Sequence, residues 1–105
     1  MEQKIRVLLA DDDRDFCARM AATLEQAGDM ELVGIAEDGA KAVDAVRELR
    51  PDLLIIDLML PVMDGVMVLS RLREQERMPA TLVLSAFASP QIGAACTSLG
   101  VDMFL

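Results

Sequence analysis

Two groups of aspartates follow apolar segments and are placed to share one site. Asp57 follows the apolar run 53–56, and Asp11–Asp13 follow the apolar run 5–10. Both runs have the composition of buried parallel strands, and parallel strands that end at the same edge bring their last residues into one crevice. The sequence therefore predicts a pocket that holds three or four carboxylates.

The chemistry of such a pocket follows from its charge. Carboxylates held close together repel, so the site needs a raised pKa on one group or a bound cation. The chain contains no histidine, and oxygen ligands alone select Mg²⁺ or another hard divalent cation. The same ion would neutralise an incoming phosphoryl group, so that one carboxylate can act as a nucleophile. We predict Asp57 as this nucleophile, since ionised groups rarely follow buried apolar runs without a function.

Length and composition exclude several classes of protein. The 105 residues predict one domain spanning 1–105. A net charge of -8 argues against direct contact with nucleic acid. No apolar run approaches the ~18 residues of a membrane span and no leader pattern is present, which predicts a cytoplasmic protein without membrane contact. Cys17 and Cys96 fall on apolar stripes of predicted helices, where free thiols are expected.

Strand and helix patterns alternate along the chain. Strands are predicted at 4–10, 31–36, 53–56, 81–85 and 101–105. Asp13, Asp38 and Asp64 are predicted to cap three helices, and Ser89-Pro90 opens a fourth that runs to Gly100. Strict alternation predicts a doubly wound α/β fold with a parallel sheet, helices on both faces and a ligand site at the carboxyl ends of the strands.

Three motifs at these strand ends resemble those of one family. They are the acidic pair Asp11-Asp12, the pattern Asp57-x-x-x-Pro61-x-x-Asp64-Gly65, and Ser85-Ala86 after the fourth strand. Together, over the whole chain, they resemble the receiver domains of two-component response regulators. The resemblance implies a flavodoxin-like fold with a five-stranded parallel sheet in the order 2-1-3-4-5.

The resemblance also implies roles for the acidic residues. Asp57 would be the phosphoacceptor, fed by the phosphohistidine of a histidine kinase or histidine phosphotransferase. Asp12 would bind the metal ion directly together with Asp57, and Asp11 would hold it through water. The backbone carbonyl of Met59 would complete the protein ligands.

Further residues match the switch and loop positions of the family. Ser85 corresponds to the hydroxyl that turns toward the acyl phosphate, and Phe104 to the aromatic side chain whose rotamer follows it. Pro61, Asp64 and Gly65 are expected to shape the loop after the phosphoacceptor. The implied function is a phosphorylation-activated switch, a regulatory domain and not an enzyme.

Family members carry a Lys-Pro pair at the end of the fifth strand, and this sequence ends about two residues before that place. We therefore expect a truncated fifth strand, no lysine in the site and no final helix. An apolar strip of the sheet would then face water, which predicts self-association. An output domain is expected outside this chain.

Within the family, the segments 10–17, 34–39 and 84–87 are similar to the sporulation-initiation regulators of endospore-forming bacteria. This narrower resemblance implies a phosphorelay and a DNA-binding output domain that controls transcription.

Two alternatives stay open from the sequence. Asp11-Asp12-Asp13 also fits the Asp-x-Asp motif of haloacid-dehalogenase-type phosphohydrolases, although these need a larger chain. The second alternative is a receiver-like module used only for protein interaction.

Overall fold

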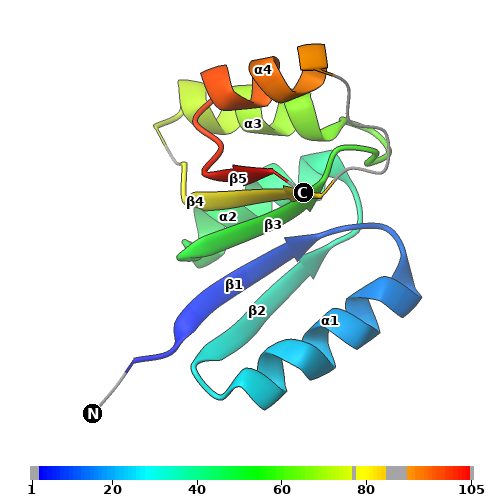
Figure 1. Ribbon diagram of the computed structural model, residues 1–105, viewed down its shortest axis with the longest axis vertical. Coiled ribbons are helices and arrows are strands. Elements are labelled where there is room, and N and C mark those ends of the chain that lie inside the picture. The colour runs from blue at the N-terminus through cyan, green and yellow to red at the C-terminus, as the bar shows by residue number, and fades with distance from the viewer. Residues whose placement is uncertain (1–2, 77, 85–89, 105) are drawn as a thin grey trace.

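A computed structural model describes residues 3–76, 78–84 and 90–104 and shows a twisted parallel sheet between two layers of helices (Figure 1). Within these residues, five strands lie in the order β2-β1-β3-β4-β5, with every neighbouring pair parallel. The strands are β1 Ile5–Ala10, β2 Met30–Ala36, β3 Leu53–Asp57, β4 Ala80–Leu84 and β5 Met103–Phe104. The helices are α1 Arg14–Ala27, α2 Gly39–Leu49, α3 Gly65–Glu74 and α4 Pro90–Ser98. The predicted α/β fold and strand order are confirmed.

Aspartates begin three of the helices, as the sequence predicts. Asp13, Asp38 and Asp64 stand directly before α1, α2 and α3 in extended conformation. Each carboxylate accepts a hydrogen bond from a backbone N–H of the first turn, at 2.8 to 3.2 Å. These bonds satisfy donors that have no partner inside the helix. The three caps fix where the chain turns from the site edge of the sheet into each helix.

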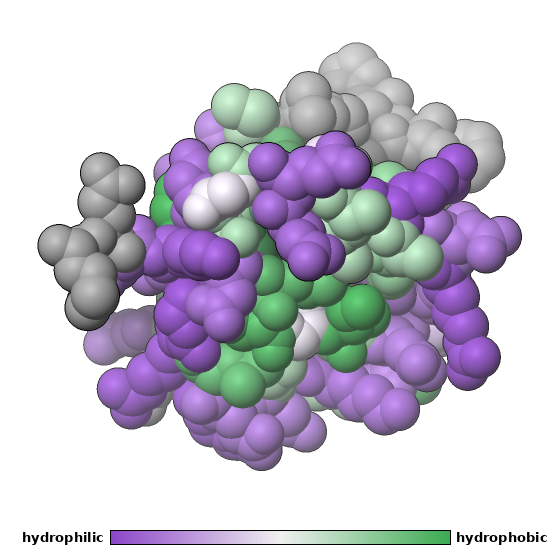
Figure 2. Space-filling model, turned by 90° about the horizontal axis from the view of Figure 1, so that it is seen from below, coloured by the Kyte–Doolittle hydropathy of each residue, from purple (hydrophilic) through white to green (hydrophobic). Residues whose placement is uncertain are grey.

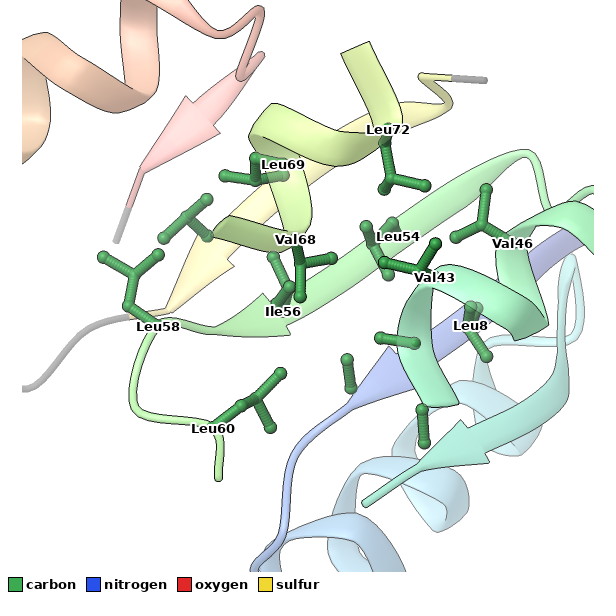
Figure 3. Packing of buried hydrophobic residues seen from close by; sticks show 14 of the residues in the cluster. Leu8, Val43, Val46, Leu54, Ile56, Leu58, Leu60, Val68, Leu69 and Leu72 are labelled. Atoms are coloured by element: carbon green, nitrogen blue, oxygen red, sulfur yellow. The ribbon is translucent and has the colours of Figure 1, made fainter. Parts of the chain in front are cut away.

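The two faces of the sheet carry separate cores. Leu8, Leu54 and Ile56 point toward α2 and α3, where they pack against buried residues that include Val43, Val46, Val68, Leu69 and Leu72 (Figure 3). Val7, Leu9 and Ile55 point to the other face, where α1 contributes Cys17 and Leu24. Alternate residues of one strand thus enter opposite cores, which explains why the strand sequences are apolar throughout.

The strand β2 forms one edge of the sheet, next to β1. Seen from below, where Figure 1 places α1 and β2, apolar side chains gather in the middle of the molecular surface with hydrophilic ones around them (Figure 2). Ile35 of β2 is among the exposed large apolar residues.

None of the helices in the described ranges has the length and apolar character that crossing a bilayer requires.

The fifth strand begins later than the sequence predicts. Strand structure starts at Met103, not at Val101. Val101 still donates its N–H to the Cys96 carbonyl at the end of α4, and Gly100 has a left-handed φ of 92°. Asp102 links this segment to β4, because its carboxylate accepts the Thr81 N–H at 2.9 Å. The helix end and this link therefore occupy residues that the apolar pattern assigned to the strand.

Candidate functional site

Three of the predicted carboxylates meet at the carboxyl end of the sheet. Asp11 and Asp12 follow β1, Asp57 ends β3, and these two strands are paired neighbours in the sheet. One oxygen from each of the three carboxylates lies within 4.8 Å of the others. Asp13 does not join them, since its carboxylate caps α1. The predicted convergence of carboxylates is confirmed for these three residues, and their roles remain predictions.

Asp11 is the buried member of the cluster, with 6% of its surface exposed. Its backbone N–H donates to the Ala36 carbonyl at 3.0 Å, and its Oδ1 accepts the Asp13 N–H at 2.9 Å. Burial raises the pKa of the Asp11 carboxyl above its usual value, and the charges of Asp57 and Asp12 raise it further, while the hydrogen bond from Asp13 opposes these effects. The ionised cluster is thus under electrostatic repulsion that a cation would relieve.

The loop after β3 closes tightly around Asp57. The Met59 N–H donates to Oδ1 of Asp57 at 3.0 Å, and the Gly65 N–H donates to the Leu58 carbonyl at 2.9 Å. A Cβ on Gly65 would lie 2.6 Å from the Leu58 Cα and 3.0 Å from the Asp57 carbonyl oxygen. Only glycine therefore fits at this position without moving the backbone that carries Asp57.

The remaining predicted site residues fall around this loop or outside the described residues. The Pro61 carbonyl accepts N–H groups from Gly39 and Met63, and Asp64 caps α3. The backbone of Phe104, in β5, pairs with Val83 of β4, but the Phe104 side chain is outside the described part. All of Ser85 is outside the described part as well. The two predicted switch residues therefore remain predictions.

A hollow of about 290 Å³ adjoins the cluster. Its walls come from the β1–α1 turn, the first turns of α1 and the end of β2, namely Asp11, Asp12, Arg14, Cys17, Ala18, Ile35 and Glu37. Sequence reasoning did not connect the end of β2, with Ile35 and Glu37, to the carboxylate cluster. Cys17 is a free thiol whose pKa is raised by burial and by the nearby Asp11 charge, so it stays protonated and unreactive.

A larger hollow, of about 520 Å³, lies away from the carboxylates. It is lined by residues at the start of β2, from α1 and before β1, namely Lys4, Ala21, Glu25, Met30, Glu31 and Leu32. None of the predicted site residues borders it. Size alone therefore does not mark the candidate site, which we place at the converging carboxylates.

The donor set of the cluster suits a hard divalent cation. Asp11, Asp12 and Asp57 supply oxygen ligands from a buried, an exposed and a half-buried position. They form the one such group found in the described part of the chain. Carboxylate oxygens without sulfur or imidazole nitrogen favour Mg²⁺ over transition metals.

Comparison with known proteins identifies the class. The family model described as the response regulator receiver domain matches residues 7–105. The chain therefore belongs to the response regulator receiver family. This assignment agrees with the motifs, and it does not support the haloacid-dehalogenase alternative.

The relatives and solved structures that the chain matches come from different whole proteins. The chain is 41% identical, over 96% of its length, to a protein-glutamate methylesterase/protein-glutamine glutaminase from Methanospirillum hungatei, of which it spans 30%. It is 32% identical to the signal receiver domain of NarL from Mycobacterium tuberculosis, with a TM-score of 0.91 over 98% of this chain and 83% of that one. The response regulator domain of CheB from Thermotoga maritima gives 26% identity and a TM-score of 0.91, over 98% and 78% of the two chains.

Proposed function

We propose that this chain is a phosphorylation-activated switch that accepts a phosphoryl group on Asp57. The donor is the phosphohistidine of a histidine kinase or histidine phosphotransferase. The observation that carries the proposal is the convergence of Asp11, Asp12 and Asp57 within 4.8 Å in a chain of the receiver family. The 105 residues contain no histidine, so the phosphohistidine lies outside them.

The geometry supports one oxygen of Asp57 as the attacking atom. Its Oδ1 accepts the Met59 N–H at 3.0 Å, so we assign the attack to Oδ2. Oδ2 forms a bond to phosphorus while the bond from phosphorus to the partner's imidazole nitrogen breaks, and the bonding electron pair returns to the imidazole. Such transfer depends mainly on position and charge stabilisation, with little covalent assistance from other groups.

The cluster would hold Mg²⁺ through Asp12 and Asp57, with Asp11 acting through water and the Met59 carbonyl completing the protein ligands. When bound, the cation neutralises phosphoryl oxygens and the repulsion among the carboxylates. Buried Asp11 fits a role at the base of the site, since its carboxylate is fixed by the Asp13 N–H.

The response to phosphorylation is proposed to pass through β4. The Leu58 N–H donates to the Leu84 carbonyl at 3.3 Å, so the residue after Asp57 is joined to the last residue of β4. Ser85 follows directly in the sequence. We propose that its hydroxyl turns toward the acyl phosphate and that Phe104 responds, which biases α4 and β5 toward a second packing.

The output is proposed to lie outside this chain, in the cytoplasm, with no nucleic-acid or membrane contact by the receiver itself. The narrower resemblance to sporulation-initiation regulators, with a DNA-binding output, stays a prediction. The methylesterase, NarL and CheB relatives do not add support for a role in sporulation.

A methylesterase output is the second candidate, because the relative from Methanospirillum hungatei carries that name at 41% identity. Phosphorylation would then control hydrolysis of glutamate methyl esters by an attached unit. An assay of the full-length protein with methylated receptor protein, before and after phosphorylation, distinguishes this output from DNA binding.

Mass measurement after incubation with Mg²⁺ and a small phosphodonor, such as acetyl phosphate, tests the proposal. We expect the wild-type protein to gain one phosphoryl group and Asp57→Asn to gain none. Asp64→Asn is the matched control, because asparagine keeps the cap of α3 and this carboxylate is outside the cluster. Equal uptake by wild type and Asp57→Asn, or no uptake by wild type, would contradict the proposal.

A further inference from the structure

The junction between β2 and α2, residues 36–39, touches both loops that carry the carboxylates. At one end, the Ala36 carbonyl accepts the Asp11 N–H at 3.0 Å. At the other end, the Gly39 N–H donates to the Pro61 carbonyl at 3.1 Å. Figure 1 shows all strands pointing to the same edge, where the loops after β1, β2 and β3 leave the sheet. The junction therefore bridges two loops that are far apart in the sequence.

The contact at Gly39 leaves no space for a side chain. A Cβ built on this buried residue would overlap the Met63 carbonyl oxygen, and it would lie 2.6 Å from the Met63 carbonyl carbon and 2.7 Å from its Cβ. These are atoms of a short turn and not the free end of a flexible side chain. Any larger residue at position 39 must therefore displace the segment 61–63.

The same segment is backbone-strained, which is an independent observation. Val62 has a left-handed φ of 69°, although valine is β-branched and 82% exposed. The Met63 N–H donates to the Pro61 carbonyl at 2.7 Å across this residue, which closes a tight turn. Such a conformation persists only where the surroundings enforce it. Two contacts hold this turn in place: the hydrogen bond from the Gly39 N–H to the Pro61 carbonyl, and the packing of Met63 on the core.

We infer that the β2–α2 junction is a positioning element that sets the separation between the Asp11–Asp12 turn and the loop of Asp57 and Met59. Gly39 is not one of the three carboxylate residues of the cluster and has no side chain to offer a ligand. It acts by holding the turn at Val62, and through it the loop that begins at Asp57. The inference rests on the proposed function, since it concerns the cation and phosphoryl site of that function.

Cation affinity measured by calorimetry with Mg²⁺ or Mn²⁺ tests the inference in the protein as it stands. We expect Gly39→Ala to weaken binding at least fivefold. Gly34→Ala is the matched control, because its Cβ would crowd the ends of the Leu49 and Leu8 side chains at 2.8 and 3.3 Å. Those groups belong to the core and not to the acidic loops, so the control should bind within twofold of wild type.

A second pair of variants keeps the test sharp if Gly39→Ala fails to fold. Asp38→Ala removes the α2 cap, in which the carboxylate accepts the Lys41 N–H at 2.8 Å, and so loosens the junction without adding atoms. Asp38→Ser loses the same charge but retains a capping oxygen. We expect cation binding by Asp38→Ala to be about twofold to threefold weaker than by Asp38→Ser.

The outcomes separate this inference from the proposed function. Normal affinity in Gly39→Ala, or equal affinity in the two Asp38 variants, would overturn the inference while wild type still binds the cation. If wild type and Asp57→Asn bind the cation equally weakly, the proposed function itself fails. Weaker binding in Gly39→Ala together with unchanged Gly34→Ala supports the positioning role.

Discussion

At the residue scale, Asp11 carries opposite consequences in the presence and absence of a cation. Its pKa is raised in the folded protein, so the folded state binds a proton more tightly than the unfolded chain does. For the metal-free protein, this group therefore adds stability as the pH falls through the raised pKa toward the usual value of 3.8, and its ionisation lowers stability at neutral pH. When a cation is bound, ionisation of Asp11 instead favours the folded state, because the cation binds the ionised cluster.

The stability of Asp11→Asn should consequently exceed that of wild type without a cation and fall relative to it when Mg²⁺ is bound. In the presence of a chelator at pH 7, we expect the variant to be more stable, by about 1 kcal/mol, because the buried charge and its repulsion are gone. With Mg²⁺ at ten times the wild-type dissociation constant, wild type should gain about 1.4 kcal/mol and the variant much less. Urea unfolding under both conditions measures these differences.

Asp13→Asn is the control for this pair of measurements. Asn keeps the cap of α1, and Asp13 is not part of the cluster, so its Mg²⁺-dependent gain should equal that of wild type. A variant Asp11→Asn that responds to Mg²⁺ as strongly as wild type would show that this carboxylate is not needed at the cation site.

At the element scale, α4 is held at its carboxyl end by a neighbouring helix. The Arg73 guanidinium of α3 donates to the Ser98 carbonyl at 2.7 Å, and the Arg73 side chain lies 3.7 Å from where a Cβ on Gly100 would stand. A cation at a helix carboxyl end satisfies a free carbonyl and complements the helix dipole. Gly93 stands inside α4, and glycine there lowers helix stability by about 1 kcal/mol relative to alanine.

Arg73→Met should therefore loosen α4 more than the rest of the molecule. We expect amide exchange in α4 to be faster than in α1 for the wild type, and about fivefold faster again in the variant, which corresponds to about 1 kcal/mol. Hydrogen exchange followed by mass spectrometry or NMR gives both comparisons. Arg71→Met is the control on the same helix, because the Arg71 side chain makes no hydrogen bond to α4 within the described residues. It should leave α4 unchanged, and equal acceleration in both variants would refute the cap.

At the scale of the whole molecule, the two faces of the sheet are covered unequally. The core on one face packs under α2, α3 and α4, whereas the helix that packs on the other core is α1. Leu82 and Leu84 of β4 are only partly buried on that second face. Met103 pairs with Leu82, so its side chain shares this face, and it is 58% exposed.

Self-association was predicted from the sequence and stays a prediction, which the face beside α1 now lets us test. We expect light scattering to show a concentration-dependent rise in mass for wild type. Met103→Glu should suppress it, because a charge on an apolar contact surface opposes its burial. Met67→Glu, at a similarly exposed methionine of α3 on the opposite side, should not. A wild type that is monomeric at all concentrations would contradict the prediction.

Several features of this protein follow from the sequence by itself. The alternation of apolar strands with capped helices predicts a parallel sheet, and a parallel sheet requires β1 and β3 to end at one edge. The meeting of Asp11, Asp12 and Asp57 follows from that requirement, because it depends on strand direction and not on the details of packing. The caps Asp13, Asp38 and Asp64 are local as well, since each bonds within its own first turn.

Tertiary structure decided what depends on contacts between distant segments. β5 starts at Met103, where Asp102 bonds to Thr81 of β4, and Gly39 packs on the turn at Met63. Each of these outcomes depends on how two loops or chain ends, separated by many residues, come together in space. Local patterns of hydrophobicity and charge contain no information on such distances, so the positioning of the site by the β2–α2 junction became visible only in the folded molecule.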